Sequence, residues 1–200
     1  MALFRLGIQT QAPHAIRGEG VYLRPLESRD YPQWAELREK SRDFLVPWEP
    51  TWPADDLSKS AFRRRLRRHN EEIERDEAYP FLLFREPDGL LLGGLTLGQV
   101  RRGVSQSATL GYWMGQPHAG KGHMTRAVRA ALAYAFDHLR LHRVEAACLP
   151  RNERSVRLLE RAGFQQEGLA RAYLRINGVW QDHILFARLE SDPPPGPGGN

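Results

Sequence analysis

The feature that most constrains this chain is a glycine-rich segment, residues 115–125, which reads GQPHAGKGHMT. It follows a predicted strand, residues 108–114, and precedes an amphipathic segment, about 123–139, whose periodicity predicts a helix. A glycine loop between a strand and a helix leaves unpaired amides at the positive end of the helix dipole. The segment therefore predicts an anion-binding loop within an α/β fold.

The loop nearly matches the phosphate-binding motif of nucleoside triphosphatases, G-x-x-x-x-G-K-[ST]. Gly115, Gly120 and Lys121 fit that motif, but Gly122 stands where a hydroxyl would coordinate magnesium. Thr125 comes three residues too late to replace this hydroxyl. A coenzyme pyrophosphate, which needs no metal, therefore fits the loop better than a nucleoside triphosphate. From the loop alone, a glycine-rich turn without any ligand stays open as the alternative.

The rest of the chain predicts elements in the order β-α-α-β-β-β-α-β-α-β-β and hence an α/β domain with a mixed sheet. The predicted strands are 21–26, 81–85, 89–97, 108–114, 143–149, 172–176 and 183–189, and the predicted helices are 28–43, 58–76, 123–139 and 152–162. We expect one domain over residues 1–190. The Pro/Gly-rich residues 191–200 predict a disordered tail.

Composition limits the class of protein further. The net charge of +5 favours an anionic partner, such as a phosphate-bearing cofactor, an acidic peptide or RNA. No segment has the apolar length of a membrane span, and the start of the chain lacks a signal-peptide pattern, so a cytoplasmic protein is expected. The single cysteine, Cys148, lies in an apolar run and predicts a core residue. His138 and His142 lack a third ligand, so no metal site is predicted.

Four motifs in one order carry a resemblance to a known family. The segment NERSVRLLERAGF, residues 152–164, resembles the N-x-x-S-x-x-x-x-E-x-x-G-F signature of the GNAT acetyltransferase superfamily. LGYWM followed by AGKGHMT resembles the coenzyme A pyrophosphate loop of its RimJ/RimL branch. The ending EGLARAYLRINGVWQDHILFARL is similar to that branch, and RDFLVPWEP, residues 42–50, is similar to its RimJ members. The resemblance covers about residues 20–190 and implies a GNAT-type mixed, mostly antiparallel twisted sheet flanked by helices.

The same resemblance implies a function. It implies transfer of acetyl from acetyl-CoA, without a metal, to the N-terminal α-amino group of Ala or Ser in a ribosomal protein, by direct attack of the amine on the thioester. Two other interpretations stay open: acetylation of a small amine (a polyamine, an antibiotic or an amino acid), and a non-catalytic ribosome-assembly or RNA-binding factor. The expected partner is a ribosomal protein N-terminus or another amine, with no membrane contact, and the protein is expected as a monomer or homodimer.

The resemblance also implies which residues contact the coenzyme. Backbone groups of Trp113 and Met114 are expected to hold the pantetheine arm and the acetyl oxygen. The expected coenzyme contacts are Trp113, Met114, His118, Ala119, Gly120, Lys121, Gly122, His123, Met124, Thr125 and Asn152. Ala119 departs from the Gln or Arg that is common in the superfamily, which backbone amides can compensate. For Asn152, a helix N-cap is an alternative role that is compatible with the first.

The catalytic residues are less well defined by the sequence. The resemblance implies that Ser155 lies beside the thioester sulfur, since a serine at this position in the RimL type is thought to stabilise or protonate the thiolate. Ser155 lies one helical turn after Asn152, so the two share a face, and an ordinary helix serine is the alternative. Leu159 occupies the place of a tyrosine that many GNAT enzymes use to protonate the thiolate. Because an α-amino group has a pKa of about 8, a weak base acting through water suffices. Glu145 and Asp182 are the strand-borne candidates for that base, with a structural role as the alternative for each.

The acceptor side is expected to come from the segment between the first two predicted helices. Phe44, Trp48 and Trp52 lie in this segment, which prolines stiffen. They predict either a peptide groove or an aromatic lid over the core. The second predicted helix carries five arginines followed by acidic residues, so a solvated face is the alternative to a contact with ribosomal RNA.

Overall fold

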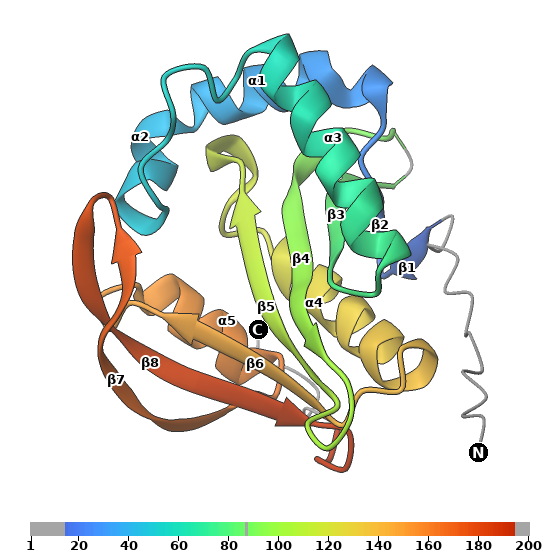
Figure 1. Cartoon of the computed structure of the whole chain (residues 1–200), viewed down its shortest axis with the longest axis vertical. Coiled ribbons are helices and arrows are strands. Elements are labelled where there is room, and N and C mark those ends of the chain that lie inside the picture. Colours follow the sequence, from blue (N-terminus) through green and yellow to red (C-terminus); the bar gives the residue numbers. More distant parts are fainter. Residues whose placement is uncertain (1–14, 87, 195–200) are drawn as a thin grey trace, which may run out of the picture.

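The computed structural model describes residues 15–86 and 88–194 of the chain. They form one eight-stranded sheet with the strand order β1-β2-β3-β4-β5-β6-β8-β7 and helices on both faces (Figure 1). The strands are β1 (Ile16–Gly18), β2 (Val21–Arg24), β3 (Tyr79–Arg85), β4 (Leu91–Arg101), β5 (Ser107–Met114), β6 (Arg143–Cys148), β7 (Gln165–Ile176) and β8 (Val179–Leu189). The α-helices are α1 (Tyr31–Lys40), α2 (Arg42–Leu45), α3 (Lys59–Glu74), α4 (His123–Ala133) and α5 (Glu153–Arg161).

One pair of strands differs from all the other neighbours in the sheet. Six of the seven pairs of neighbouring strands are antiparallel, whereas β5 and β6 pair parallel with each other, from Ser107↔Arg143 to Leu110↔Ala146. Beyond Leu110, β5 continues to Met114 and β6 to Cys148 without pairing to each other. The prediction of a mixed, mostly antiparallel sheet is confirmed, and its centre contains a gap between two diverging strands.

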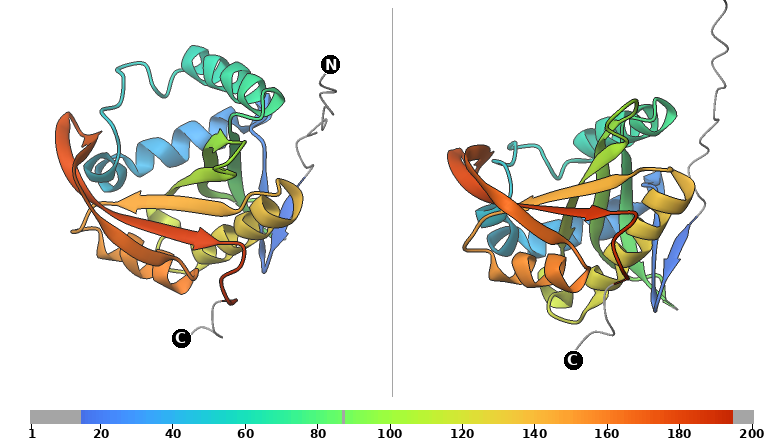
Figure 2. Two further views of the ribbon diagram at one scale, coloured as in Figure 1. Left: turned by 60° about the horizontal axis from the view of Figure 1, so that its bottom comes forward. Right: turned by 90° about the horizontal axis from the view of Figure 1, so that it is seen from below.

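The two faces of the sheet bury different cores, and Figure 2 shows the helices on either side. The larger core joins the sheet to α4 and α5, and it includes Leu110 of β5, Val128 of α4 and Leu159 of α5. The smaller core joins the sheet to α1 and α3 through Trp34 and Phe62. Strand alternation decides which side each β5 residue faces, so Leu110 and Tyr112 face the larger core, whereas Trp113 packs against the smaller one.

Several predicted elements differ in extent from the observed ones. The predicted helix 28–43 is interrupted at Ser41, a buried residue whose hydroxyl accepts a hydrogen bond from the Gln116 amide (2.9 Å). The predicted helix 123–139 is α-helical to Ala133 and then continues as a π-helical turn, η4 (Tyr134–His138). Three short 3-10 turns complete the helical segments: η1 (Ser28–Asp30), η2 (Val46–Trp48) and η3 (Gln116–His118).

The last two strands are longer than predicted, and β1 was not predicted at all. β7 pairs with β8 over most of its length, and register shifts near Gly168 and Ala172 mark bulges. Bulges interrupt the two-residue periodicity, which hides such strands from a pattern search. β1 has only three residues, too few for any pattern.

The described chain ends in contact with the domain. Arg188 donates to the carbonyl oxygens of Asp192 (3.1 Å) and Pro193 (2.6 Å), and the Asp192 carboxylate accepts from the Leu189 amide (2.8 Å). The predicted tail boundary at residue 191 therefore falls within a hydrogen-bonded segment, and residues 195–200 lie outside the described residues. Over residues 15–86 and 88–194, no helix has the length and apolar character needed to cross a membrane.

Candidate active site

The loop between β5 and α4 has the backbone conformation that glycine adopts most easily. Gly120 and Gly122 have φ angles of 76° and 75°, in the left-handed region. A Cβ atom added at either residue would meet no other atom within 4 Å, so the surface beside the loop is open. Gly122 is the N-cap of α4, and no described side chain caps this helix. Its first-turn amides are therefore available to an anion, at the positive end of the helix dipole.

The other loop residues divide into those that build the turn and those that face the anion site. The amides of His118 and Ala119 donate to Gly115 (2.9 Å) and Gln116 (3.3 Å) within the turn. Lys121 Nζ donates to the Pro117 carbonyl (2.9 Å). Met124 is buried in the larger core. The amides from Gly120 to Thr125 are thus better placed for a phosphate than those of His118 and Ala119.

The two loop histidines lie partly buried among cations. Burial lowers the pKa of both His118 and His123 from the usual value for histidine, Lys121 and Arg85 lower both further, and Arg126 lowers that of His123. His123 Nδ1 lies 2.8 Å from a guanidinium nitrogen of Arg126. Since the loop already gathers cations, an anion bound here would relieve their mutual repulsion.

Gly115 explains why the loop imitates a nucleotide-binding motif. An added Cβ would lie 2.4 Å from Leu37 Cδ1 on α1, so the backbone approaches α1 too closely for any other residue. The first glycine of the near match therefore permits helix packing.

Trp113 occupies the α1 side of β5, at the unpaired end of the strand. Its indole lies over Gly94 of β4, where an added Cβ would come within 2.5 Å of the indole nitrogen. The guanidinium carbon of Arg38 is 5.0 Å from the centre of the indole ring. Gly94 of β4 therefore leaves room for the Trp113 indole, whereas Gly93 leaves room for the backbone of Trp113 and Met114.

On the opposite side of β5, two hydroxyl groups meet. Tyr112 and Ser155 have their oxygen atoms 2.6 Å apart. Asn152 caps α5 and positions Ser155, because its side-chain oxygen accepts the Ser155 amide (3.2 Å). Burial raises the pKa of the Tyr112 phenol far above 10, although the bond to Ser155 opposes this effect. The pair is fully protonated at neutral pH and can donate a proton beside the β5–β6 gap.

Tyr112 was not among the residues that the sequence singled out. Strand alternation contained a signal for it, since Tyr112 shares the face of Leu110 and not that of Trp113. Leu159, which occupies the expected place of a tyrosine, is buried in the larger core with 1% of its surface exposed. Cys148 is also buried in that core, as predicted, and burial raises the pKa of its thiol.

The two candidate bases are used in structural contacts. Glu145 of β6 pairs with Arg101 and with Arg143 (3.0 Å). Asp182 of β8 accepts the amide of Ala172 (2.8 Å), which has a φ of 46° at the β7 bulge. In the described part of the chain, no hydrogen bond or ion pair joins either carboxylate to Ser155 or Tyr112. This geometry favours structural roles for both.

The three predicted acceptor-side aromatics surround the start of α5 and the end of α1. A guanidinium group lies over each ring. The distance from the guanidinium carbon to the ring centre is 5.8 Å for Arg154 and Phe44, 5.2 Å for Arg151 and Trp48, and 4.0 Å for Arg38 and Trp52. The Asn177 amide, at the tip of the β7–β8 hairpin, donates to the Glu49 carbonyl (2.9 Å), and Figure 1 shows the hairpin tip beside α2. The segment that follows α2 therefore connects the hairpin with the helix that carries Ser155.

The arginine-rich helix α3 is partly balanced by carboxylates. Arg64 pairs with Asp55 (2.6 Å) and Arg68 with Glu72 (3.5 Å). Arg63 and Arg67 are exposed and have no ion pair within the described residues. A contact of α3 with RNA stays a prediction.

Comparison with known proteins identifies the family. Residues 21–165 match the family model described as Acetyltransferase (GNAT) domain. The chain belongs to the GNAT acetyltransferase family. It is 42% identical over 177 residues to the Probable N-acetyltransferase YjcK of Bacillus subtilis, covering 88% of this chain and 98% of that protein. It is 37% identical over 191 residues to the [Ribosomal protein uS5]-alanine N-acetyltransferase of Escherichia coli, covering 95% of this chain and 98% of that protein.

A solved structure supports the same assignment. Mycobacterium smegmatis RimJ, in complex with CoA-disulfide, superimposes with a TM-score of 0.82 at 32% identity, covering 88% of this chain and 86% of that one. This GNAT protein is an acetyl-CoA-dependent N-acetyltransferase. The residues present fit the coenzyme, since the uncapped start of α4 suits a pyrophosphate and the β5–β6 gap exposes unpaired strand edges. Among the described residues, no three His, Cys, Asp or Glu side chains gather as metal ligands.

Proposed function

We propose that this GNAT enzyme acetylates the N-terminal α-amino group of Ala or Ser in a ribosomal protein. The relative from Escherichia coli that carries this activity in its name aligns with 95% of the chain. The observation that carries the proposal is the Tyr112–Ser155 hydroxyl pair, to which no described carboxylate is bonded. A site with proton donors and no adjacent base suits an amine that is already partly neutral.

The pKa of the acceptor amine distinguishes protein N-termini from lysines and polyamines. An α-amino group has a pKa of about 8, against about 10.4 for lysine, so a much larger fraction is neutral near pH 7.5. The geometry thus favours an α-amine. Acetyl-CoA, when bound, supplies the thioester that this amine attacks.

Each hydroxyl of the pair has a role in this mechanism. Ser155 donates its proton to the leaving thiolate, and Tyr112 then donates to the Ser155 oxygen. Water takes up the proton that the acetylated amine releases, and a proton from solvent restores the Tyr112 phenol. Asn152 holds the start of α5, so the hydroxyl is fixed before the substrates arrive. The amides of residues 120–125 hold the pyrophosphate. Such an enzyme would work in the cytoplasm, where ribosomal proteins are made.

The test is an incubation of the purified protein with acetyl-CoA and a panel of peptides. The peptides begin with Ala, Ser or Met and contain an internal lysine, and matched controls have a blocked N-terminus. Mass spectrometry should place the acetyl group on the α-amino group of the Ala and Ser peptides and find none on blocked ones. Acetylation of lysine alone, or of spermidine but of no peptide, would contradict the proposal.

A further inference from the structure

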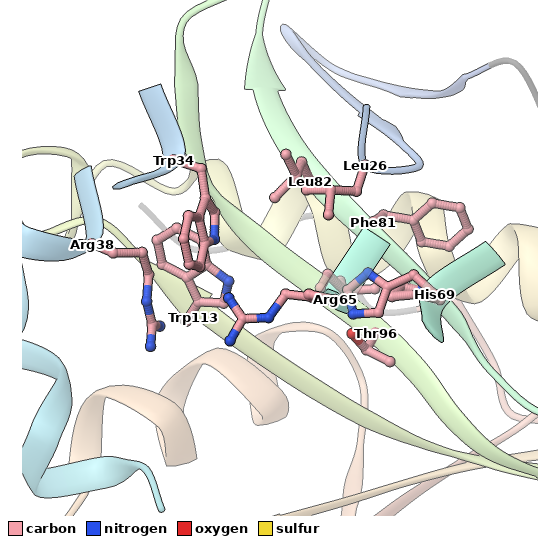
Figure 3. Close-up of a pocket in the computed structure, with 11 residues that line it drawn as sticks. Leu26, Trp34, Arg38, Arg65, His69, Phe81, Leu82, Thr96 and Trp113 are labelled. Carbon is pink, nitrogen blue, oxygen red and sulfur yellow. The ribbon is translucent and has the colours of Figure 1, made fainter. Parts of the chain in front are cut away.

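A cavity of about 210 Å³ lies on the α1 and α3 side of the sheet, apart from the glycine loop. Figure 3 shows side chains from both helices converging there with residues of the sheet. We call it the α1–α3 pocket. Its polar side chains are Arg38, Arg65, His69 and Thr96, the indole rings of Trp34 and Trp113 lie beside them, and the rest of its wall is apolar. Trp113 follows Tyr112 along β5, so the pocket and the Tyr112–Ser155 pair lie on opposite faces of the same end of the strand.

Arg38 presents an unsatisfied donor at this pocket. Its two terminal nitrogens donate to the Glu49 carboxylate, both at 2.8 Å. Its Nε atom is buried and has no hydrogen-bond partner within the described residues, and only 9% of the side chain is exposed. A buried N–H group without an acceptor is costly, so an acceptor atom that entered the pocket beside Arg38 would relieve this cost.

His69 and Arg65 add further hydrogen-bonding groups to the pocket whose hydrogen bonds are incomplete. Three buried side-chain polar atoms in the described chain lack a partner, and two of them, Arg38 Nε and His69 Nδ1, belong to this pocket. Burial, and then the charges of Arg68 and Arg65, lower the pKa of His69 to about 4, so the imidazole is neutral. Arg65 donates to Asp56 through only one nitrogen (2.8 Å) and lies 4.6 Å from the centre of the Trp34 ring.

No carboxylate is among the eleven residues that form the described wall. The carboxylates that pair with the two arginines, Glu49 and Asp56, lie outside it. A ligand amine or polyamine would meet two guanidinium groups and no carboxylate on the wall itself. A carboxylate would meet guanidinium donors between flat aromatic walls, which is the pairing that arginine favours.

We propose that the α1–α3 pocket binds an acidic side chain, Asp or Glu, that follows the amino group of the acceptor peptide. This inference rests on the proposed function and adds a specificity to it. An extended peptide rises about 3.4 Å per residue, so an acid a few residues after the amine can reach across the end of β5 from the Ser155 side. Arg38 and Arg65 are thereby assigned as specificity residues.

The test compares peptides that differ at one position. Each begins with Ala followed by glycines, and carries Glu, Gln or Lys at the second, third or fourth position. At one of these positions, Glu should give a kcat/KM about tenfold above that of Lys, mainly through KM, which is the effect of one charge-assisted contact. Arg65→Ala should remove this preference. Arg67→Ala, on the exposed part of the same helix, should keep it.

The possible outcomes separate this proposal from the proposed function. If wild-type enzyme acetylates all the peptides equally, the proposal of an acid-binding pocket is overturned, and the proposal of N-terminal acetylation is unaffected. If no peptide is acetylated and spermidine is, both fail. Thermal melting and the KM for acetyl-CoA should show that Arg65→Ala is folded. If it is not, His69→Phe removes the ring nitrogens at similar volume and should reduce the preference, and an unchanged preference would also overturn the proposal.

Discussion

At the residue scale, the hydroxyl pair beside the β5–β6 gap comes from different elements than the family pattern suggests. Leu159 of α5 packs in the larger core and has no titratable group. The phenol that approaches Ser155 belongs to Tyr112 of β5, 43 residues earlier in the sequence. Under the proposed function, a strand tyrosine and a helix serine share the task that one helix tyrosine performs in many GNAT enzymes.

Replacement of Ser155 by Ala should lower kcat by about 100-fold, because general acid catalysis contributes this much or more. The KM for acetyl-CoA should change little, since the amides of residues 120–125 remain. Tyr112→Phe should have a smaller effect on kcat, because Ser155 keeps its own proton. Steady-state kinetics with the best peptide measures both, and Ser155→Thr, which keeps a hydroxyl, should retain more activity. A Ser155→Ala enzyme with wild-type kcat would rule out this role.

At the element scale, the β5–α4 loop depends on two left-handed glycines rather than on charged side chains. Gly120 and Gly122 shape the backbone, while Lys121 bonds within the loop. The helix start carries no side-chain cap among the described residues, so a bound anion is the natural partner of its amides.

Gly122→Ala should raise the KM for acetyl-CoA about tenfold, because a left-handed alanine costs roughly 1–2 kcal/mol and the loop would shift to escape it. The reason is the backbone, since the added Cβ meets nothing within 4 Å. Gly168→Ala is the matched control, because its Cβ also meets nothing within 4 Å and its φ is not positive. Equal effects of both substitutions on KM would contradict the assignment of the loop.

Elements and sites differ in how far the sequence predicts them. Helix α4 and strand β5 follow from local periodicity, and Asn152 and Ser155 from one helical turn. The broken helix at Ser41 could not be predicted, because the break depends on a bond to Gln116, 75 residues away. The Arg38 and His69 pocket depends in the same way on two helices meeting over one sheet. Contacts of this kind have no local pattern.

At the scale of the whole molecule, two cores on opposite faces of one sheet hold the domain together. Beside the smaller core, His69 and the arginines near it are partly buried, and this burial costs folding free energy. This cost links the stability of the whole domain to pH.

The free energy of unfolding should fall as the pH drops from about 6.5 to about 4. In this range the unfolded chain binds a proton at His69, while the folded protein, with its pKa of about 4, does not. A pKa shift of this size lowers the free energy of unfolding by about 3 kcal/mol, and the loss is complete once the pH is below the pKa of His69 in the folded protein. Urea unfolding at pH 7.5 and pH 4.5 measures it. His69→Gln should lose less stability over this range than wild type, and an equal loss in both would assign the effect to other groups.

The short parallel ladder between β5 and β6 has a mechanical consequence. The strand ladder between the half-sheet β1–β5 and the half-sheet β6–β8 has four residue pairs, and helix contact between α4 and α5 supplies further attachment. A coenzyme in the gap would contact both half-sheets, and part of its binding free energy would be used to restrict their relative motion. Amide hydrogen exchange in residues 111–114 should then slow when acetyl-CoA binds. The enzyme would meet its acceptor as a stiffer body than the free protein, which favours an order of binding with the coenzyme first.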